Sequence, residues 1–305
     1  MHEHVQDYLR FRRALGFKLK WHGRILPQFA DYLEAAGSAT ITDELAIAWA
    51  QLPTRVHPIT WTQRLGVVRG FATYLKTIAP ATQIPPKGVF PGQGKRPDPY
   101  IFSEQDITRL LGATSTLATP LRAATCRTLF GLLAVSGMRI SEALALHRDH
   151  VDLDSGILTI ISAKSEAPRL VPLHPTATTM LGEYAELRDR LRPRATATTF
   201  FISHRGTALL HGPVMAAFIQ LTAQIGIRTE TTKPRIHDLR HSFAVACLLA
   251  WYRSGDDVAG HMPALSTYLG HINPAGTYWY LSAVPELMQL AAQRLQTQAD
   301  LAASS

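Results

Sequence analysis

A segment rich in proline and glycine, residues 79–99, is the feature that most limits how this chain can fold. It holds six prolines and three glycines. Proline fixes φ and lacks a backbone N–H, so no helix continues through such a run. The pattern therefore predicts a first domain over residues 1–80, a linker over residues 81–99 and a second domain over residues 100–305.

The two flanking segments differ in their apolar spacing. Residues 1–80 show helical spacing throughout, as in Leu65, Val68 and Leu75. The second segment also predicts helices, one that starts after Ser103 and others at about 120–136, 140–146, 175–191, 213–225, 237–252 and 263–269. Only the runs 157–161 and 169–173, with a shorter one at 200–203, are typical of strands. We therefore expect a mainly α protein with a small β-sheet, made of a helical N-terminal domain and an α+β second domain.

The positive charge is concentrated in the first domain and its linker. The chain carries a formal net charge of +8, and residues 1–98 hold thirteen Lys and Arg against seven Asp and Glu. A basic surface of this kind favours a polyanionic partner, most often nucleic acid, although an acidic membrane surface is an alternative. A solvated basic face with no partner is the other interpretation.

The cysteines and the hydropathy of the chain indicate the cellular compartment of the protein. The two cysteines, Cys126 and Cys247, lie in apolar runs and form no CxxC pair, which predicts buried, reduced thiols. No apolar stretch reaches 18 residues, and the first residues are polar rather than a signal core. We expect a cytoplasmic protein that does not bind membranes.

Three short motifs carry residues suited to phosphate chemistry. Arg139 follows a glycine and precedes Glu142 by three residues, so the two share a helix face; alone, such a pair is usually a surface ion pair. His237 and Arg240 also stand three apart at a helix start, where Arg offers a fork for two phosphate oxygens and His transfers protons near neutral pH. The third motif, Leu-Gly-His at 269–271, is followed nine residues later by Tyr280.

A zinc site is disfavoured although His237 and His241 stand four residues apart. The HExxH motif requires Glu after the first His, and Asp238 occupies that position. The tyrosines at 278 and 280 flank a tryptophan, a composition that is ordinarily core or interface.

Taken together, the motifs resemble the tyrosine recombinase (phage integrase) family over about residues 100–285. The order Arg139, His237 with Arg240, His271 and Tyr280 matches the family's boxes, and Tyr278 is out of register. The basic first domain resembles the family's core-binding (SAM-like) domain. The family also uses a lysine in a β-hairpin turn, and Lys164 lies between the two predicted strands.

The resemblance implies a metal-independent strand transfer that needs no cofactor. Tyr280 would attack a DNA phosphate and form a 3′-phosphotyrosyl link, while Arg139, Arg240 and His271 would bind the phosphate oxygens. A phenol ordinarily has a pKa of about 10, so the reaction needs a base, for which His237 is the candidate. Lys164 is the candidate acid for the leaving 5′-oxygen, and Glu142 would orient Arg139.

The resemblance also implies double-stranded DNA as substrate and a homotetramer, or an assembly with related recombinases, on paired sites. The first domain would grip the duplex opposite the second domain, and the linker would complete a C-shaped clamp. The expected backbone contacts of the first domain are Arg12, Arg13, Lys18, Lys20 and Arg24. An amphipathic tail helix from Pro285 to Asp300 would pack on its own domain or on a neighbouring protomer.

One departure and several alternatives stay open. Residues 251–263 predict a longer loop than the family usually has. The longer loop favours a transposon-type branch of the family, whose members are integrases of mobile elements. A type IB topoisomerase would share the fold and the tyrosine chemistry. A catalytically silent DNA-binding protein and a metal-dependent nuclease are disfavoured, the first by the intact set of six residues and the second by the lack of an acidic cluster.

Overall fold

The computed structural model describes residues 1–91, 98–161, 168–270, 275–283, 286–293 and 296. The chain divides into two compact units, Met1–Pro97 and Asp98–Ser305, which we call the N-terminal and C-terminal units. Each is described separately below. As predicted, the fold is mainly α with one small sheet.

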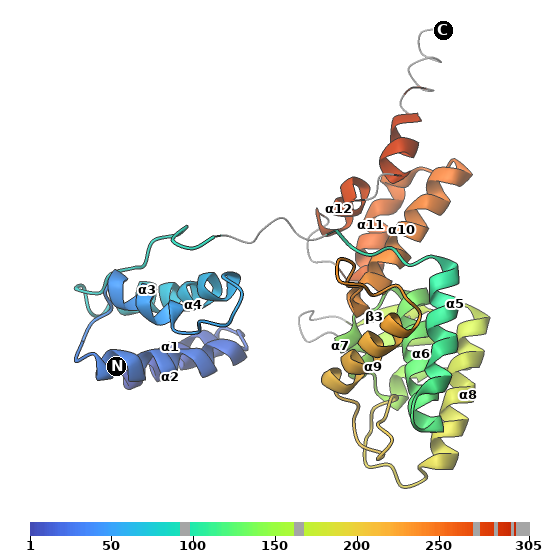
Figure 1. Cartoon of the computed structure of the whole chain (residues 1–305), viewed down its shortest axis with the longest axis horizontal. Helices are drawn as coiled ribbons and strands as arrows, with labels where there is room; N and C mark the ends of the chain where they lie inside the picture. The colour runs from blue at the N-terminus through green and yellow to red at the C-terminus, as the bar shows by residue number, and fades with distance from the viewer. Residues whose placement is uncertain (92–97, 162–167, 271–274, 284–285, 294–295, 297–305) are drawn as a thin grey trace. The chain divides into compact units, whose positions relative to one another are not determined.

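The N-terminal unit is built of four helices: α1 (His2–Ala14), α2 (Lys20–Ala35), α3 (Asp43–Gln51) and α4 (Ile59–Leu75) (Figure 1). Its core is aromatic, since the ring of Phe29 lies 5.0 Å from that of Trp49 and Tyr8 lies 5.5 Å from Phe71. Thr42 caps α3 by accepting a hydrogen bond from the N–H of Leu45 at 3.2 Å. Apolar faces at helical spacing therefore bury one another, as their periodicity predicts.

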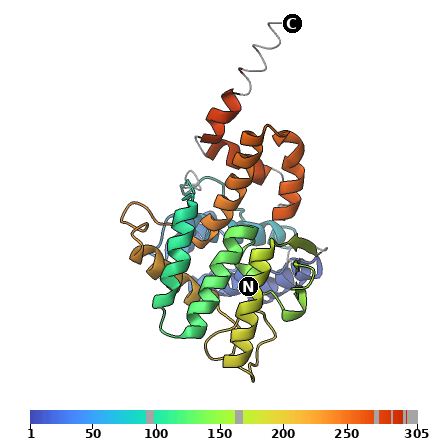
Figure 2. The same cartoon turned by 90° about the vertical axis from the view of Figure 1, so that its right-hand side faces the viewer.

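The C-terminal unit is built of eight helices and one sheet within the described residues, with short 3₁₀ turns at Thr114–Thr116 and Arg148–His150. The helices are α5 (Glu104–Ala113), α6 (Pro120–Ser136), α7 (Ile140–Leu144), α8 (Pro175–Leu191), α9 (His211–Gln224), α10 (Ile236–Ser254), α11 (Val258–Leu269) and α12 (Ala275–Ala283). Helices α5, α6 and α8 run side by side, with α6 in the middle (Figure 2). Ser103 caps α5, and Gly137 ends α6 in the left-handed conformation, both as predicted.

The sheet has three antiparallel strands in the order β1-β2-β3. The predicted hairpin is formed by β2 (Ile157–Ile160) and β3 (Arg169–Pro172), which pair Leu158 with Val171. A short first strand, β1 (Val151–Asp152), was not predicted, because two residues carry no periodicity. Leu158 and Val171 are fully buried against the helices, so the sheet is fixed on the core by one face.

Two predicted elements differ in the structure. The segment 251–263 is not a long loop: α10 extends to Ser254 and α11 begins at Val258, so only residues 255–257 connect them. Gly255 ends α10 at φ 85°, and Asp257 caps α11 by accepting from the N–H of Gly260. The run 200–203 contains one isolated bridge, between Ile202 and Ala208, rather than a strand, and Phe200 and Phe201 are buried in the core.

The chain after α12 returns to the core of its own unit where it is described. Leu287 is fully buried in the cluster that also holds Leu248, Met262 and Tyr280, whereas Met288 is 57% exposed. Across the described ranges, no helix is long and apolar enough to cross a membrane.

Candidate active site

The site begins where α6 ends. Gly137 adopts φ 58°, and a Cβ at this position would lie 2.5 Å from the ring of Phe243, so a larger residue cannot be accommodated without movement. The turn places Arg139 at the N-cap of α7. Its backbone N–H donates to Oε2 of Glu142 at 2.9 Å, and its guanidinium donates to Oε1 at 2.9 Å. The expected Arg139–Glu142 pair is therefore present.

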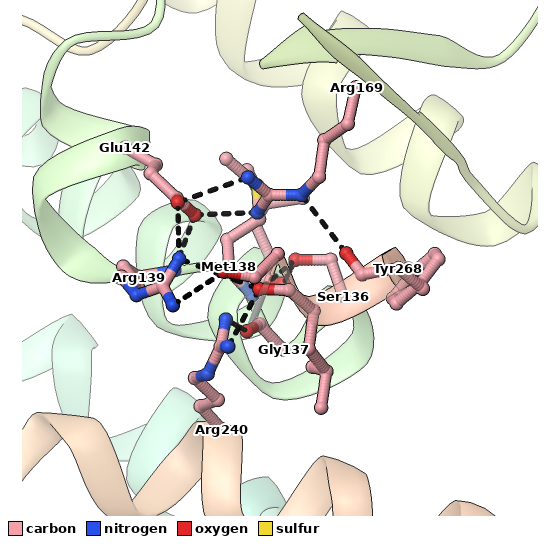
Figure 3. Close-up of polar contacts among 11 residues, drawn as sticks. Ser136, Gly137, Met138, Arg139, Glu142, Arg169, Arg240 and Tyr268 are labelled. Carbon is pink, nitrogen blue, oxygen red and sulfur yellow. Dashed lines mark hydrogen bonds and ion pairs between the residues drawn. The ribbon is translucent and has the colours of Figure 1, made fainter. Parts of the chain in front are cut away.

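The carboxyl end of α11 brings two arginines together (Figure 3). Arg240 donates to the Leu269 carbonyl at 2.7 Å, and Arg139 donates to the Gly270 carbonyl at 2.9 Å and to Leu269 at 3.5 Å. The last carbonyls of a helix lack intrahelical donors and carry partial negative charge. They accept here from two guanidinium groups that α7 and α10 supply, so two segments about a hundred residues apart in sequence meet at one point.

Arg240 is almost completely buried, with 1% of its surface exposed. It also donates to the Gly137 carbonyl at 2.8 Å. Burial lowers its pKa and the nearby Arg139 lowers it further, while Tyr280 and Glu142 act in the opposite direction.

Glu142 is the anion of the site. Burial raises its pKa, but hydrogen bonds from Arg169 and from the Arg139 backbone, together with the Arg169 charge, outweigh burial and lower the pKa to about 2. Arg169 of β3 donates to both carboxylate oxygens, at 3.0 and 2.7 Å. Sequence reasoning did not select Arg169, because nothing in a short strand indicates which helix its side chain will reach.

The two histidines of the α10 box have different environments. His237 is exposed at the helix start, and its ring lies 4.6 Å from that of His241. His241 is buried, and its Nδ1 lies 3.0 Å from the hydroxyl of Tyr280. Tyr280 is also buried, at 1% exposed, whereas Tyr278 is 49% exposed. The hydrogen bond between His241 and Tyr280 was not predicted, although His241 lies one helical turn after His237.

The structure accordingly brings together Arg139, Glu142 and Arg240. Tyr280 of α12 contacts His241, the residue that follows Arg240. Two predicted site residues, Lys164 and His271, lie outside the described residues. Asp238, whose presence disfavoured the zinc motif, accepts hydrogen bonds from Nε and Nη2 of the Arg235 side chain and from the Arg235 backbone N–H, and so completes the N-terminal cap of α10.

The five predicted DNA contacts gather at one end of the α1–α2 pair. Arg12 lies in the last turn of α1, Lys18 in the connection and Lys20 at the first position of α2. Arg13, Lys18, Lys20 and Arg24 are exposed, while the guanidinium carbon of Arg12 stacks 4.1 Å above the ring of Phe17. The turn is therefore basic with an aromatic centre, a surface suited to a phosphate backbone.

Residues 101–286 match the phage integrase family. A protein of Sinorhizobium fredii named as an integrase/recombinase, y4rB, is 44% identical over 302 residues, 96% of each chain. The tyrosine recombinase XerD of Listeria innocua is 26% identical and covers 88% of this chain and 93% of its own. The integrase of the Tn1549 transposon, solved in complex with transposon right end DNA, has the same fold: its TM-score is 0.69, at 14% identity, over 97% of this chain and 98% of its own.

The arginine pair at the end of α11 and the family match over more than half of the chain agree with each other. The protein belongs to the phage integrase family of tyrosine recombinases, a class of DNA strand-transferring enzymes.

Proposed function

We propose that the protein is a site-specific DNA recombinase that cuts and rejoins strands through a 3′-phosphotyrosyl link to Tyr280. The observation that carries the proposal is the convergence of Arg139 and Arg240 on the last carbonyls of α11. Two guanidinium groups at one point form a clamp for the two non-bridging oxygens of a phosphodiester. His271, the next residue after Gly270 in the sequence, is the proposed third donor.

The clamp would act as charge builds on the phosphorus. Displacement at a phosphodiester increases the negative charge on the non-bridging oxygens, and fixed cations that already face them lower the barrier. The carbonyls of residues 137, 269 and 270 hold both guanidinium groups before DNA arrives. Positioning of this kind avoids reorganisation during the reaction.

Tyr280 would supply the nucleophilic oxygen and become joined to the 3′-phosphate, and the leaving 5′-oxygen would take a proton from Lys164. His237, exposed beside His241, is the proposed base for the phenol. In this structure the Tyr280 hydroxyl lies 3.0 Å from Nδ1 of His241. The link keeps the energy of the broken phosphodiester, so a second 5′-hydroxyl can reverse the reaction without ATP.

The N-terminal unit would bind the DNA backbone through the basic turn between α1 and α2. XerD-like relatives and the transposon integrase carry names that describe recombination and transposon-end binding. By similarity we propose a tetramer on paired DNA sites, a cytoplasmic location and a mobile element as the source of the substrate.

A nicked suicide duplex tests this function directly. Duplexes drawn from the DNA flanking the gene are incubated with the full-length protein in EDTA, and covalent complexes are resolved on denaturing gels. We expect a complex that carries the 3′ end of the cut strand and forms without divalent ions. A product with a free 3′-hydroxyl, formed only with Mg²⁺, would favour a nuclease, and relaxation of plasmids without paired sites would favour a topoisomerase.

A further inference from the structure

Arg169 donates three hydrogen bonds at this site, and the proposed reaction gives this residue no role. Its Nη1 and Nη2 donate to Oε1 and Oε2 of Glu142 at 3.0 and 2.7 Å, and its Nε donates to the Tyr268 carbonyl at 3.0 Å. The side chain is 15% exposed. All three nitrogens therefore donate to protein acceptors (Figure 3).

Glu142 connects this arginine to the phosphate clamp. The carboxylate accepts two hydrogen bonds from Arg169 and two from Arg139, one from its backbone and one from its side chain. Four donors fill the acceptor positions that a carboxylate offers. The orientation of the carboxylate, and with it the direction of the Arg139 guanidinium, is thus set from the side of β3.

Charge gives a second reason for the contact. Arg139 and Glu142 alone would form a neutral pair, and a neutral pair offers little attraction to a phosphate. Arg169 turns the pair into a group of three with a net positive charge. The Glu142 carboxylate can then hold Arg139 in place while the cluster keeps a positive charge for the DNA.

The same side chain ties three segments together. Through Tyr268 it holds the last turn of α11, through Glu142 it holds the start of α7, and it belongs to the strand that follows the predicted Lys164 turn. The contact with α11 is close, since a Cβ at Gly270 would lie 3.1 Å from Nη1 of Arg169. The glycine that ends α11 therefore also leaves room for this guanidinium.

We propose that Arg169 is a positioning residue for DNA cleavage. Arg169 fixes Glu142, Glu142 directs the Arg139 guanidinium at the scissile phosphate, and the charge of Arg169 keeps the cluster positive. The inference rests on the proposed recombinase function. Replacing a side chain that orients the ligand of a metal typically changes activity about 10- to 100-fold, and we expect an effect of the same order here. The contacts predict that the loss of Arg169 slows cleavage by displacing the Arg139 guanidinium.

The test is the single-turnover rate of covalent complex formation on the suicide duplex, at saturating protein. Arg169→Met removes the charge at similar volume, and we expect it to slow the reaction by about 10- to 100-fold. Arg169→Lys returns the charge without the planar fork and should recover part of the loss. Arg148→Met is the matched control, because Arg148 also donates two bonds to a carboxylate, Asp189, on the exposed surface of the same unit.

A second substrate separates positioning from folding. A methylphosphonate in place of the scissile phosphate removes one negative charge and therefore reduces the demand for the Arg139 cation. The ratio of wild-type to Arg169→Met rates should shrink on this duplex, whereas damage to the fold would slow both substrates equally. Binding of the intact duplex, measured by gel shift, should change little between the two proteins.

The outcomes are distinct. Unchanged cleavage by Arg169→Met, an equal ratio on the two substrates, or a Lys variant as slow as the Met variant would each overturn the role of Arg169. In all of these the wild-type protein still forms the covalent complex, and the proposed function stands. A wild-type protein that forms no complex on any flanking duplex would overturn the proposed function itself and the inference with it.

Discussion

The hydroxyl of Tyr280 lies 3.0 Å from Nδ1 of His241, and both side chains are buried in the C-terminal unit. His241 directly follows Arg240 in α10, so one turn of helix carries a clamp residue and the partner of the proposed nucleophile. The structure thus connects the proposed nucleophile to α10 through the residue that follows Arg240.

The energy of this bond is measurable by a double-mutant cycle. His241→Phe and Tyr280→Phe each remove the bond, so their effects on unfolding should not add. We expect a coupling free energy of about 0.5–1.5 kcal/mol, the usual net contribution of a buried hydrogen bond. Calorimetry of the C-terminal unit's transition in the full chain provides the measurement. Additive effects would show that the two groups do not stabilise one another.

Glu142 predicts a specific loss of stability in acid. Its pKa falls from an ordinary 4.5 to about 2, so its contribution is fully present above pH 4.5 and is lost as the pH falls through about 2. The shift corresponds to on the order of 3 kcal/mol. Glu142→Gln should therefore be less stable than wild type at pH 7, with the difference shrinking toward pH 2.

The control for this series is Glu183→Gln, the same chemical change at an exposed position of α8. Its unfolding temperature should follow that of the wild type at every pH. If the unfolding temperatures of Glu142→Gln and of the wild type ran parallel between pH 4.5 and 2, the carboxylate would not be stabilised by its arginines.

Both thiols should react slowly in the native protein. Burial raises the pKa of Cys126 and of Cys247 to about 11. Since the thiolate is the reactive form, alkylation by iodoacetamide at about pH 8 should be on the order of 100-fold slower than in urea. Mass spectrometry of timed samples follows each site. Cys126 is buried and Cys247 is half-buried, and rapid native labelling of either cysteine would contradict its raised pKa.

The fold was predictable where local residues decide it. Ser103 and Gly137 mark helix ends by chemistry that acts within a few residues, and the structure has them there. At the connection 255–257 the sequence-based prediction is wrong, because a proline in the first turn favours a helix start at Pro263. The structure places Pro263 inside α11, which Asp257 starts earlier. A proline near a helix start is compatible with several boundaries, and packing of Val258 and Met262 selects this one.

The site was predictable from motifs and not from periodicity. Arg139, Glu142 and Arg240 meet because α7, α10 and α11 pack together, and only the resemblance to a family anticipated that packing. Arg169 and His241 belong to the candidate site because they contact segments distant in sequence: Arg169 contacts Tyr268, and His241 contacts Tyr280. No local pattern encodes such a contact, so the structure was needed to find them.

DNA affinity should depend on salt through the turn between α1 and α2. Neutralising Arg12, Arg13, Lys18 and Lys20 together should reduce the slope of log K against log salt by about 0.9 for each DNA phosphate that the turn no longer neutralises, or roughly 3–4 in total. Fluorescence anisotropy over a salt series measures the slope. Substitution of the exposed Arg55, Lys76 and Lys87 is the control, and should leave it nearly unchanged. Equal slopes for all proteins would move the DNA contacts elsewhere.

Peptide mapping of the trapped complex tests most directly whether Tyr280 becomes joined to DNA. After nuclease digestion, mass spectrometry should find the nucleotide remnant on Tyr280, and Tyr280→Phe should bind the duplex but form no adduct. Tyr278→Phe, at the exposed neighbouring tyrosine, should still form it. An adduct that persists in Tyr280→Phe and disappears in Tyr278→Phe would contradict the assignment.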